Sequence, residues 1–233
     1  MGRLPTSRGQ SNSQDIDRFI DQLQQAPALV TGGTGRLLFA LDATASRQPT
    51  WDHASHLQSE MFTAAANLGG LQIQLCYFRG YREFQHSLWL TESRQLLQQM
   101  NQVHCAAGHT QIARILQHAI NETRKKPVQA VVFIGDSMEE TLDQLCQLAG
   151  QLGLLNTPVF LFQEGTDPIT HRAMQQIARL SGGAHLQFDQ RSASQLKALL
   201  KAVAIFATGG KKALEHYAQS QDQTVLRLTQ QLK

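Results

Sequence analysis

The sequence has 233 residues, of which 42% are hydrophobic and 17% charged, and its formal net charge is +3. These values are ordinary for a soluble globular protein, and the length is enough for one α/β domain with short extensions. No run of like charges is long enough for a nucleic-acid footprint, and no apolar run approaches the ~18 residues that span a membrane. We therefore expect binding to neither nucleic acid nor membrane.

The chain divides into three parts by its pattern of apolar residues. Residues 1–34 are expected to form a polar tail with one short helix, which Pro27 ends. Residues 35–206 alternate between short apolar runs and helix-periodic segments, as one α/β domain does. Residues 207–233 are expected to form a helical extension after this domain.

Six short apolar runs within the domain predict β-strands, at 37–42, 71–78, 84–90, 128–135, 158–162 and 184–188. Segments with apolar residues at helical spacing predict helices between them, at 51–68, 93–102, 112–126, 142–152, 168–180 and around 196–203. Strands that alternate with helices of this length are typical of a doubly wound sheet. We therefore predict a mostly parallel, six-stranded sheet flanked by helices, with one short antiparallel edge strand.

The cysteines bear on the compartment of the protein. The chain has three of them, so they cannot all pair within it. Cys76 lies in a predicted strand and Cys146 at an apolar position of a predicted helix, which is typical of reduced, buried thiols. Disulfides are rare in the cytoplasm, and we therefore expect a cytoplasmic protein.

Carboxylate and hydroxyl side chains gather after the first predicted strand. Asp42, Thr44 and Ser46 stand two residues apart, so in an extended segment their side chains point the same way. They leave the carboxyl end of the strand, which is where open α/β sheets bind ligands. Asp136 follows the strand at 128–135 in the same manner. Thr110 lies in a loop of small residues directly before a helix.

The oxygen atoms of these five side chains indicate the kind of metal. Hard oxygen ligands suit Mg²⁺ or Mn²⁺, and Mg²⁺ tends to keep some of its water ligands. No cysteine or convergent pair of histidines accompanies them in the sequence, which speaks against zinc. The sequence therefore predicts a site for Mg²⁺ or Mn²⁺.

The order of these motifs is that of a known family. Asp-x-Thr-x-Ser, then Gly-x-Thr, then Gly-Asp resembles the metal-ion-dependent adhesion site of von Willebrand factor type A (vWA) domains, which occur in integrins and in many bacterial intracellular proteins. The resemblance covers roughly residues 35–205. The usual first motif of the family is Asp-x-Ser-x-Ser, and Thr44 keeps the hydroxyl group of the Ser that it replaces.

The resemblance also implies how each residue acts. Ser46, Thr44 and Thr110 would contact the metal directly, whereas Asp42 and Asp136 would act largely through water. The strands that precede the two aspartates would lie side by side at the point where the strand order reverses. Neutral hydroxyl ligands leave the metal electrophilic, so a Glu or Asp of a partner protein could complete its coordination. The resemblance therefore implies a non-enzymatic interaction module, and we expect a bacterial protein.

Two other interpretations stay open at this stage. A phosphohydrolase of the haloacid dehalogenase type would use Asp42 as its nucleophile and Asp136 to hold Mg²⁺, with Lys125 or Lys126 as its lysine. Such enzymes usually carry a second Asp two residues after the nucleophile, where this chain has Thr44. The alternative to both functions is a structural domain without metal, since Asp, Thr and Ser commonly cap helices and form turns.

Overall fold

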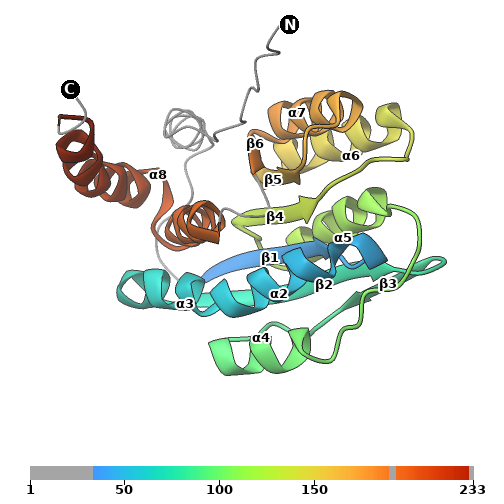
Figure 1. Cartoon of the computed structure of the whole chain (residues 1–233), viewed down its shortest axis with the longest axis horizontal. Coiled ribbons are helices and arrows are strands. Elements are labelled where there is room, and N and C mark those ends of the chain that lie inside the picture. The colour runs from blue at the N-terminus through green and yellow to red at the C-terminus, as the bar shows by residue number, and fades with distance from the viewer. Residues whose placement is uncertain (1–33, 189–192, 231–233) are drawn as a thin grey trace, which may run out of the picture.

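The computed structural model describes residues 34–188 and 193–230, and its centre is one six-stranded sheet (Figure 1). The strand order is β3-β2-β1-β4-β5-β6. The strands are β1 (Gly35–Asp42), β2 (Leu71–Arg79), β3 (Glu83–His86), β4 (Ala130–Gly135), β5 (Val159–Glu164) and β6 (Ala184–Phe188). All neighbouring strands are parallel except β3, which pairs antiparallel with β2 at one edge. The predicted doubly wound sheet with one antiparallel edge strand is confirmed.

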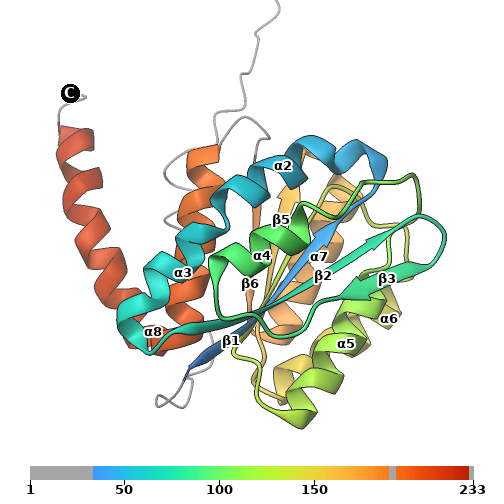
Figure 2. The ribbon, with the colours of Figure 1, turned by 90° about the horizontal axis from the view of Figure 1, so that it is seen from below.

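Helices cover both faces of the sheet, as Figure 2 shows. The helical elements are η1 (Ala45–Arg47), α2 (Gln48–Leu57), α3 (Ser59–Ala65), η2 (Ala66–Leu68), α4 (Ser93–Met100), α5 (Ile112–Lys125), α6 (Leu142–Leu154), α7 (Pro168–Ser181) and α8 (Ala193–Gln230). Elements α2, α3, α4 and the first part of α8 pack on one face, and α5, α6 and α7 pack on the other.

The central strand β1 is buried on both faces. Leu37, Phe39 and Leu41 face the layer that contains α8, whereas Leu38 and Ala40 face the layer that contains α5. Successive side chains of a strand point to opposite faces, so a strand between two helical layers needs an unbroken apolar run. This explains why its apolar run shows no alternation with polar residues.

Two elements differ from the sequence-based prediction. The predicted helix at 51–68 is divided into α2, α3 and η2, and it begins earlier because Pro49 fits the first turn of α2. The predicted strand at 84–90 pairs continuously only over β3. Directly after β3, the backbone N–H of Leu75 in β2 donates to the side-chain hydroxyl of Ser87. An isolated antiparallel bridge then pairs Leu90 with Ile73 of β2. A side chain thus replaces a ladder bond and interrupts the strand.

Helix α8 spans both the last predicted helix of the domain and the helical extension predicted after it. It contains a break at Gly210, whose φ of 66° and ψ of −166° are not helical. The part before this break packs on the sheet, and the part after it still buries Leu214 in the core before it leads away from the domain (Figures 1 and 2). No helix among the described residues is both long and apolar enough to cross a membrane. The short helix expected near the N-terminus lies outside the described residues.

The three cysteines are free thiols in different environments. Cys76 is buried, as predicted. Cys146 is only half-buried, because it lies at the border of the apolar face of α6, and its thiol approaches the side-chain oxygen of Gln176 at 3.6 Å.

Candidate metal centre

The carboxyl ends of β1 and β4 bring Asp42 and Asp136 to the same edge of the sheet. The two strands are parallel neighbours, and Leu41 pairs with Ile134 in their register. Gly135 makes the close approach possible: an added Cβ would lie 2.7 Å from the ring of Phe133 and 3.6 Å from the Cβ of Asp42. A larger residue at Gly135 would therefore displace the ring of Phe133, whereas its contact with Asp42 would be an ordinary van der Waals contact.

Asp42 is a buried carboxylate with one partner for its two oxygens. Only 3% of the residue is exposed. Its Oδ1 accepts a hydrogen bond of 2.7 Å from the backbone N–H of Thr44, whereas its buried Oδ2 accepts none from the described residues. Burial raises the pKa of Asp42 from 3.8 to about 6, against the hydrogen bond from Thr44, which lowers the pKa. A cation beside Oδ2 would remove this cost of ionisation.

The segment after β1 carries the two hydroxyl groups of the first motif. Thr44 has an extended backbone and stands before the short helix η1, and its side chain makes no capping hydrogen bond to that helix. The exposed Ser46 donates a hydrogen bond of 3.4 Å from Oγ to Oδ2 of Asp136. The structure therefore joins Ser46 of the first motif to Asp136 of the last one.

Arg47 is a charged residue of the site that the sequence did not indicate. Its guanidinium is buried and lies 3.2 Å from Oδ2 of Asp136. It also forms an ion pair with Glu164 at the end of β5, and it donates a hydrogen bond of 2.8 Å to the hydroxyl of Thr50. Burial alone would lower the pKa of Arg47, but Glu164, Asp136 and Asp42 together raise it. The site thus has a fixed positive charge beside its carboxylates.

Thr110 lies against the loop that follows β4. Its buried hydroxyl accepts a hydrogen bond of 3.0 Å from the backbone N–H of Glu139, and its own N–H donates to that residue's carboxylate at 3.2 Å. Thr110 does not cap α5, because the carboxylate of Glu140 accepts hydrogen bonds from Ile112 and Ala113 at the start of that helix. Among the described residues, no hydrogen bond joins Thr110 to the side chain of either aspartate.

The loop of Thr110 is nevertheless tied to the end of β1. The backbone N–H of Ala106 donates a hydrogen bond of 3.0 Å to the carbonyl of Ala43, which directly follows Asp42. His109 is exposed at the rim, and its Nδ1 lies 2.9 Å from the carboxylate of Glu139. No sequence signal identified Arg47, Glu139, Glu140 or Glu164, since each acts through a partner from a distant part of the chain.

The candidate metal ligands at this edge of the sheet all have oxygen as the ligating atom. They are the carboxylates of Asp42 and Asp136 and the hydroxyls of Thr44, Ser46 and Thr110. Within residues 34–188 and 193–230, no group of three His, Cys, Asp or Glu side chains forms a metal cage. A divalent ion here would therefore be held in part by neutral hydroxyls, a set of hard oxygen donors that fits Mg²⁺ or Mn²⁺.

No protein-family model matches the sequence, and no curated protein matches it. A von Willebrand factor type A protein from Catenulispora acidiphila matches the structure with a TM-score of 0.62 at 13% identity, over 80% of this chain and 48% of that one. The VWA domain of SpRpn10 matches with a TM-score of 0.56 at 13% identity, over 73% of this chain and 95% of that domain.

The domain has the von Willebrand factor type A fold. A further structure with this likeness is proximal thread matrix protein 1 from the mussel byssus, solved with zinc in its metal-ion-dependent adhesion-site motif. It matches with a TM-score of 0.57 at 14% identity, over 76% of this chain and 48% of that one. The chain thus spans about half the length of that protein and of the Catenulispora acidiphila protein. These likenesses establish the vWA fold of the chain.

Proposed function

We propose that this vWA domain is a non-enzymatic, metal-dependent protein-interaction module. It binds Mg²⁺ or Mn²⁺ through Ser46, Thr44 and Thr110, with Asp42 and Asp136 acting largely through water. The observation that carries the proposal is the buried Oδ2 of Asp42, to which no described protein group donates a hydrogen bond. Buried charges are usually paired or coordinate a metal, and without such a partner the pKa shifts toward the neutral form, as it does for Asp42.

The charges around the site favour docking of a carboxylate. Ser46, Thr44 and Thr110 are neutral ligands, so a bound divalent ion keeps much of its positive charge. A Glu or Asp from a partner protein can then complete the coordination of the ion. The buried Arg47 offsets part of the negative charge of the carboxylates at this edge, since it lies 3.2 Å from Asp136 and also pairs with Glu164. The positive charge that an acidic group of a partner meets is therefore that of the bound metal ion itself.

Two observations favour this proposal over a phosphohydrolase of the haloacid dehalogenase type. The position of that enzyme's second Asp is taken by Thr44, which cannot serve as a general acid at neutral pH. Lys125 and Lys126, the proposed lysines, end α5 just before β4 begins. They therefore lie near the start of β4, whereas Asp136 follows its opposite end, and the ammonium of Lys125 pairs with Glu122.

The cation that fills the site in the cell remains a proposal. Zinc occupies the corresponding motif of the mussel protein, so Zn²⁺ belongs in the experiment beside Mg²⁺ and Mn²⁺. A cytoplasmic location in a bacterial cell is likewise our proposal, and the free thiols of the described residues support a reducing compartment.

The proposal is tested by calorimetric titration of the chain with each cation, with and without a short peptide that contains one Glu. We expect Mg²⁺ and the peptide each to bind more tightly in the presence of the other, because binding linkage is reciprocal. Ser46→Ala and Thr110→Ala should abolish this coupling. Thr63→Ala is the matched control, since its hydroxyl is exposed on α3 and bonds only to its own helix. The proposal is wrong if none of the cations changes peptide binding.

A further inference from the structure

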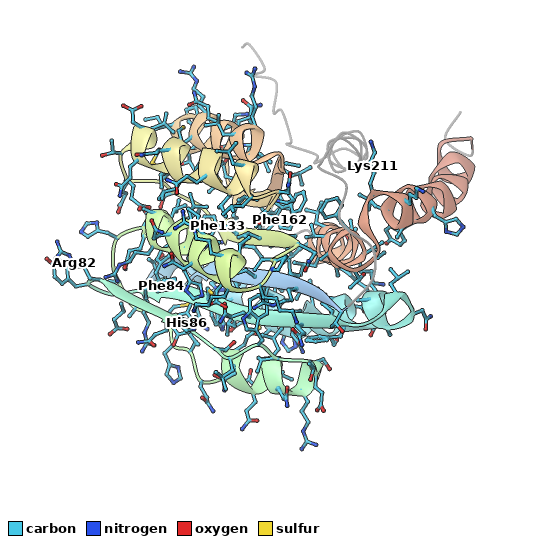
Figure 3. The ribbon with its side chains drawn as sticks, turned by 180° about the vertical axis from the view of Figure 1, so that it is seen from behind. Arg82, Phe84, His86, Phe133, Phe162 and Lys211 are labelled. Atoms are coloured by element: carbon cyan, nitrogen blue, oxygen red, sulfur yellow. The ribbon has the colours of Figure 1, made fainter. Side chains whose placement is uncertain are left out.

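A basic pocket lies next to Thr110, between the turn from β2 to β3 and the start of α5. Its volume is about 590 Å³. The side chains that give it chemical character are those of Tyr81, Arg82, His109, Thr110, Arg114 and Glu140. Figure 3 shows Arg82 at the outer end of the hairpin, far from the buried Phe133 and Phe162. Since Thr110 is also a candidate metal ligand, the pocket and the proposed metal site share a wall.

The pocket is held in shape by contacts between its two sides. The backbone N–H of Gly80 donates to the carbonyl of Ala106 at 3.4 Å. Gly108 packs so closely that an added Cβ would lie 2.2 Å from the carbonyl oxygen of Gly80. On the other side, Arg114 donates a hydrogen bond of 2.6 Å to the carbonyl of Arg82. Hydrogen bonds and close packing thus hold the turn between β2 and β3 against the start of α5 and the loop before it.

The two arginines of the pocket lack acidic partners among the described residues. The contacts of Arg82 are a cation–π contact, 5.3 Å from the ring centre of Tyr81, and the bond that its carbonyl accepts. Arg114 donates to that carbonyl and to the side-chain oxygen of Gln111. The neighbouring Arg79, in contrast, forms an ion pair of 2.7 Å with Glu83.

The two carboxylates near the pocket already accept hydrogen bonds from other groups of the protein. Glu140 accepts hydrogen bonds from the backbone N–H groups of Ile112 and Ala113 at 2.5 and 2.9 Å. Glu139 accepts one from the N–H of Thr110 and lies 2.9 Å from the ring nitrogen of His109. Neither lies within ion-pairing distance of an arginine of the pocket. The two guanidinium groups are therefore available to an acidic group from outside.

We propose that this pocket binds a second acidic side chain of the partner, beside the one that binds the metal. The occupant is an acidic protein segment in which two Asp or Glu residues stand close together in the sequence. A guanidinium group binds a carboxylate through two parallel hydrogen bonds, which gives direction as well as affinity. The inference rests on the proposed function, because the first carboxylate must dock on the metal.

The test compares two capped Gly/Ser peptides, one with a single Glu and one with an added Asp near that Glu. Binding is measured at low ionic strength with Mg²⁺ and again with a chelator. We expect the second acidic residue to tighten Mg²⁺-dependent binding by up to about fivefold, since both arginines are exposed and an exposed ion pair contributes up to about 1 kcal/mol. Arg82→Asn and Arg114→Gln should each remove most of this gain. Asn is chosen because Arg82 has a φ of 59°, a conformation that Asn tolerates.

Arg172→Gln is the matched control, because it removes the same charge from an exposed position on α7. It should leave the gain from the added Asp unchanged. The inference alone is overturned if the single-Glu peptide binds with Mg²⁺ but the added Asp brings no gain. It is also overturned if Arg172→Gln reduces the gain as much as the two pocket variants do. If neither peptide shows Mg²⁺-dependent binding, the proposed function fails, and the inference that rests on it fails too.

Discussion

Replacing Asp42 by Asn should stabilise the metal-free protein at neutral pH. The Asn side chain has nearly the same shape, and its oxygen can still accept the hydrogen bond of 2.7 Å from the N–H of Thr44. The pKa of Asp42 rises from 3.8 to about 6 through burial, so ionising it in the folded protein costs about 3 kcal/mol more than in the unfolded chain. The Asn variant avoids this cost.

The gain is smaller than the whole cost of ionisation. The amide group of the introduced Asn places an unpaired donor where Oδ2 of Asp42 is buried, which costs about 1–2 kcal/mol. The expected net stabilisation at about pH 7.5 is therefore about 1–2 kcal/mol. Most substitutions destabilise a protein. If Asp42→Asn stabilises this one, the carboxylate of Asp42 lacks a partner in the metal-free protein.

The stability difference between the wild type and Asp42→Asn should depend on pH. A carboxyl group whose pKa is raised by folding favours the folded state at low pH, and this contribution is lost as the pH rises through about 6. The free energy of unfolding of the wild type should therefore fall, relative to that of Asp42→Asn, between about pH 4 and pH 7. Above this range the difference between the two proteins should be constant.

The assay is urea unfolding of both proteins across this pH range with a chelator present, followed by the same series with Mg²⁺. Mg²⁺ should stabilise the wild type, because it binds only the folded state, and should leave Asp42→Asn unchanged. The reasoning is refuted if the variant is less stable than the wild type at every pH. The reasoning is also refuted if the difference in free energy of unfolding between the two proteins does not vary with pH, because ionisation of Asp42 would then not cause that difference.

Three further predictions concern the surroundings of the site and the core. Arg47→Met should cost about 3–5 kcal/mol in urea unfolding without metal, because it leaves Glu164 and Asp136 without their buried cation, and a loss under about 1 kcal/mol would contradict this. Phe206→Ala should cost about 3–5 kcal/mol in the same assay, because the ring is fully buried on the face of the sheet that carries α8. Burial lowers the pKa of His185 to about 4, so the free energy of unfolding falls as the pH drops below about 6.5. His185→Gln should remove up to about 3 kcal/mol of this loss. An equal dependence of the free energy of unfolding on pH in both proteins would contradict this prediction.

Much of the fold could be predicted because the signals are local. The apolar run of β1 and the helical spacing in α5 depend on residues that are neighbours in the sequence, and both elements are found where they were predicted. The end of β3 could not be predicted, because it depends on the hydroxyl of Ser87 replacing a bond of the ladder. The helical extension was predicted to begin near the break in α8, but the non-helical conformation of Gly210 could not be predicted from periodicity.

The candidate site was only partly predictable for a related reason. The sequence places Asp42 and Asp136 at the ends of strands, but their proximity follows from the pairing of β1 with β4, which only the resemblance to vWA domains implied. Arg47 carries no signal of its own, since an arginine after a loop is usually exposed. Its role depends on Glu164, which is 117 residues away in the chain.

The central claim is most directly tested by a crystal structure of the protein grown with Mn²⁺, with diffraction measured where Mn²⁺ scatters anomalously. Our account predicts one anomalous peak at the carboxyl ends of β1 and β4, with Ser46 and Thr110 among its direct ligands and Asp42 close by. It also predicts that Ser46→Ala removes the peak. The account is contradicted if saturating Mn²⁺ gives no peak there while the side chains of Arg47 and Asp136 remain paired as they are without metal.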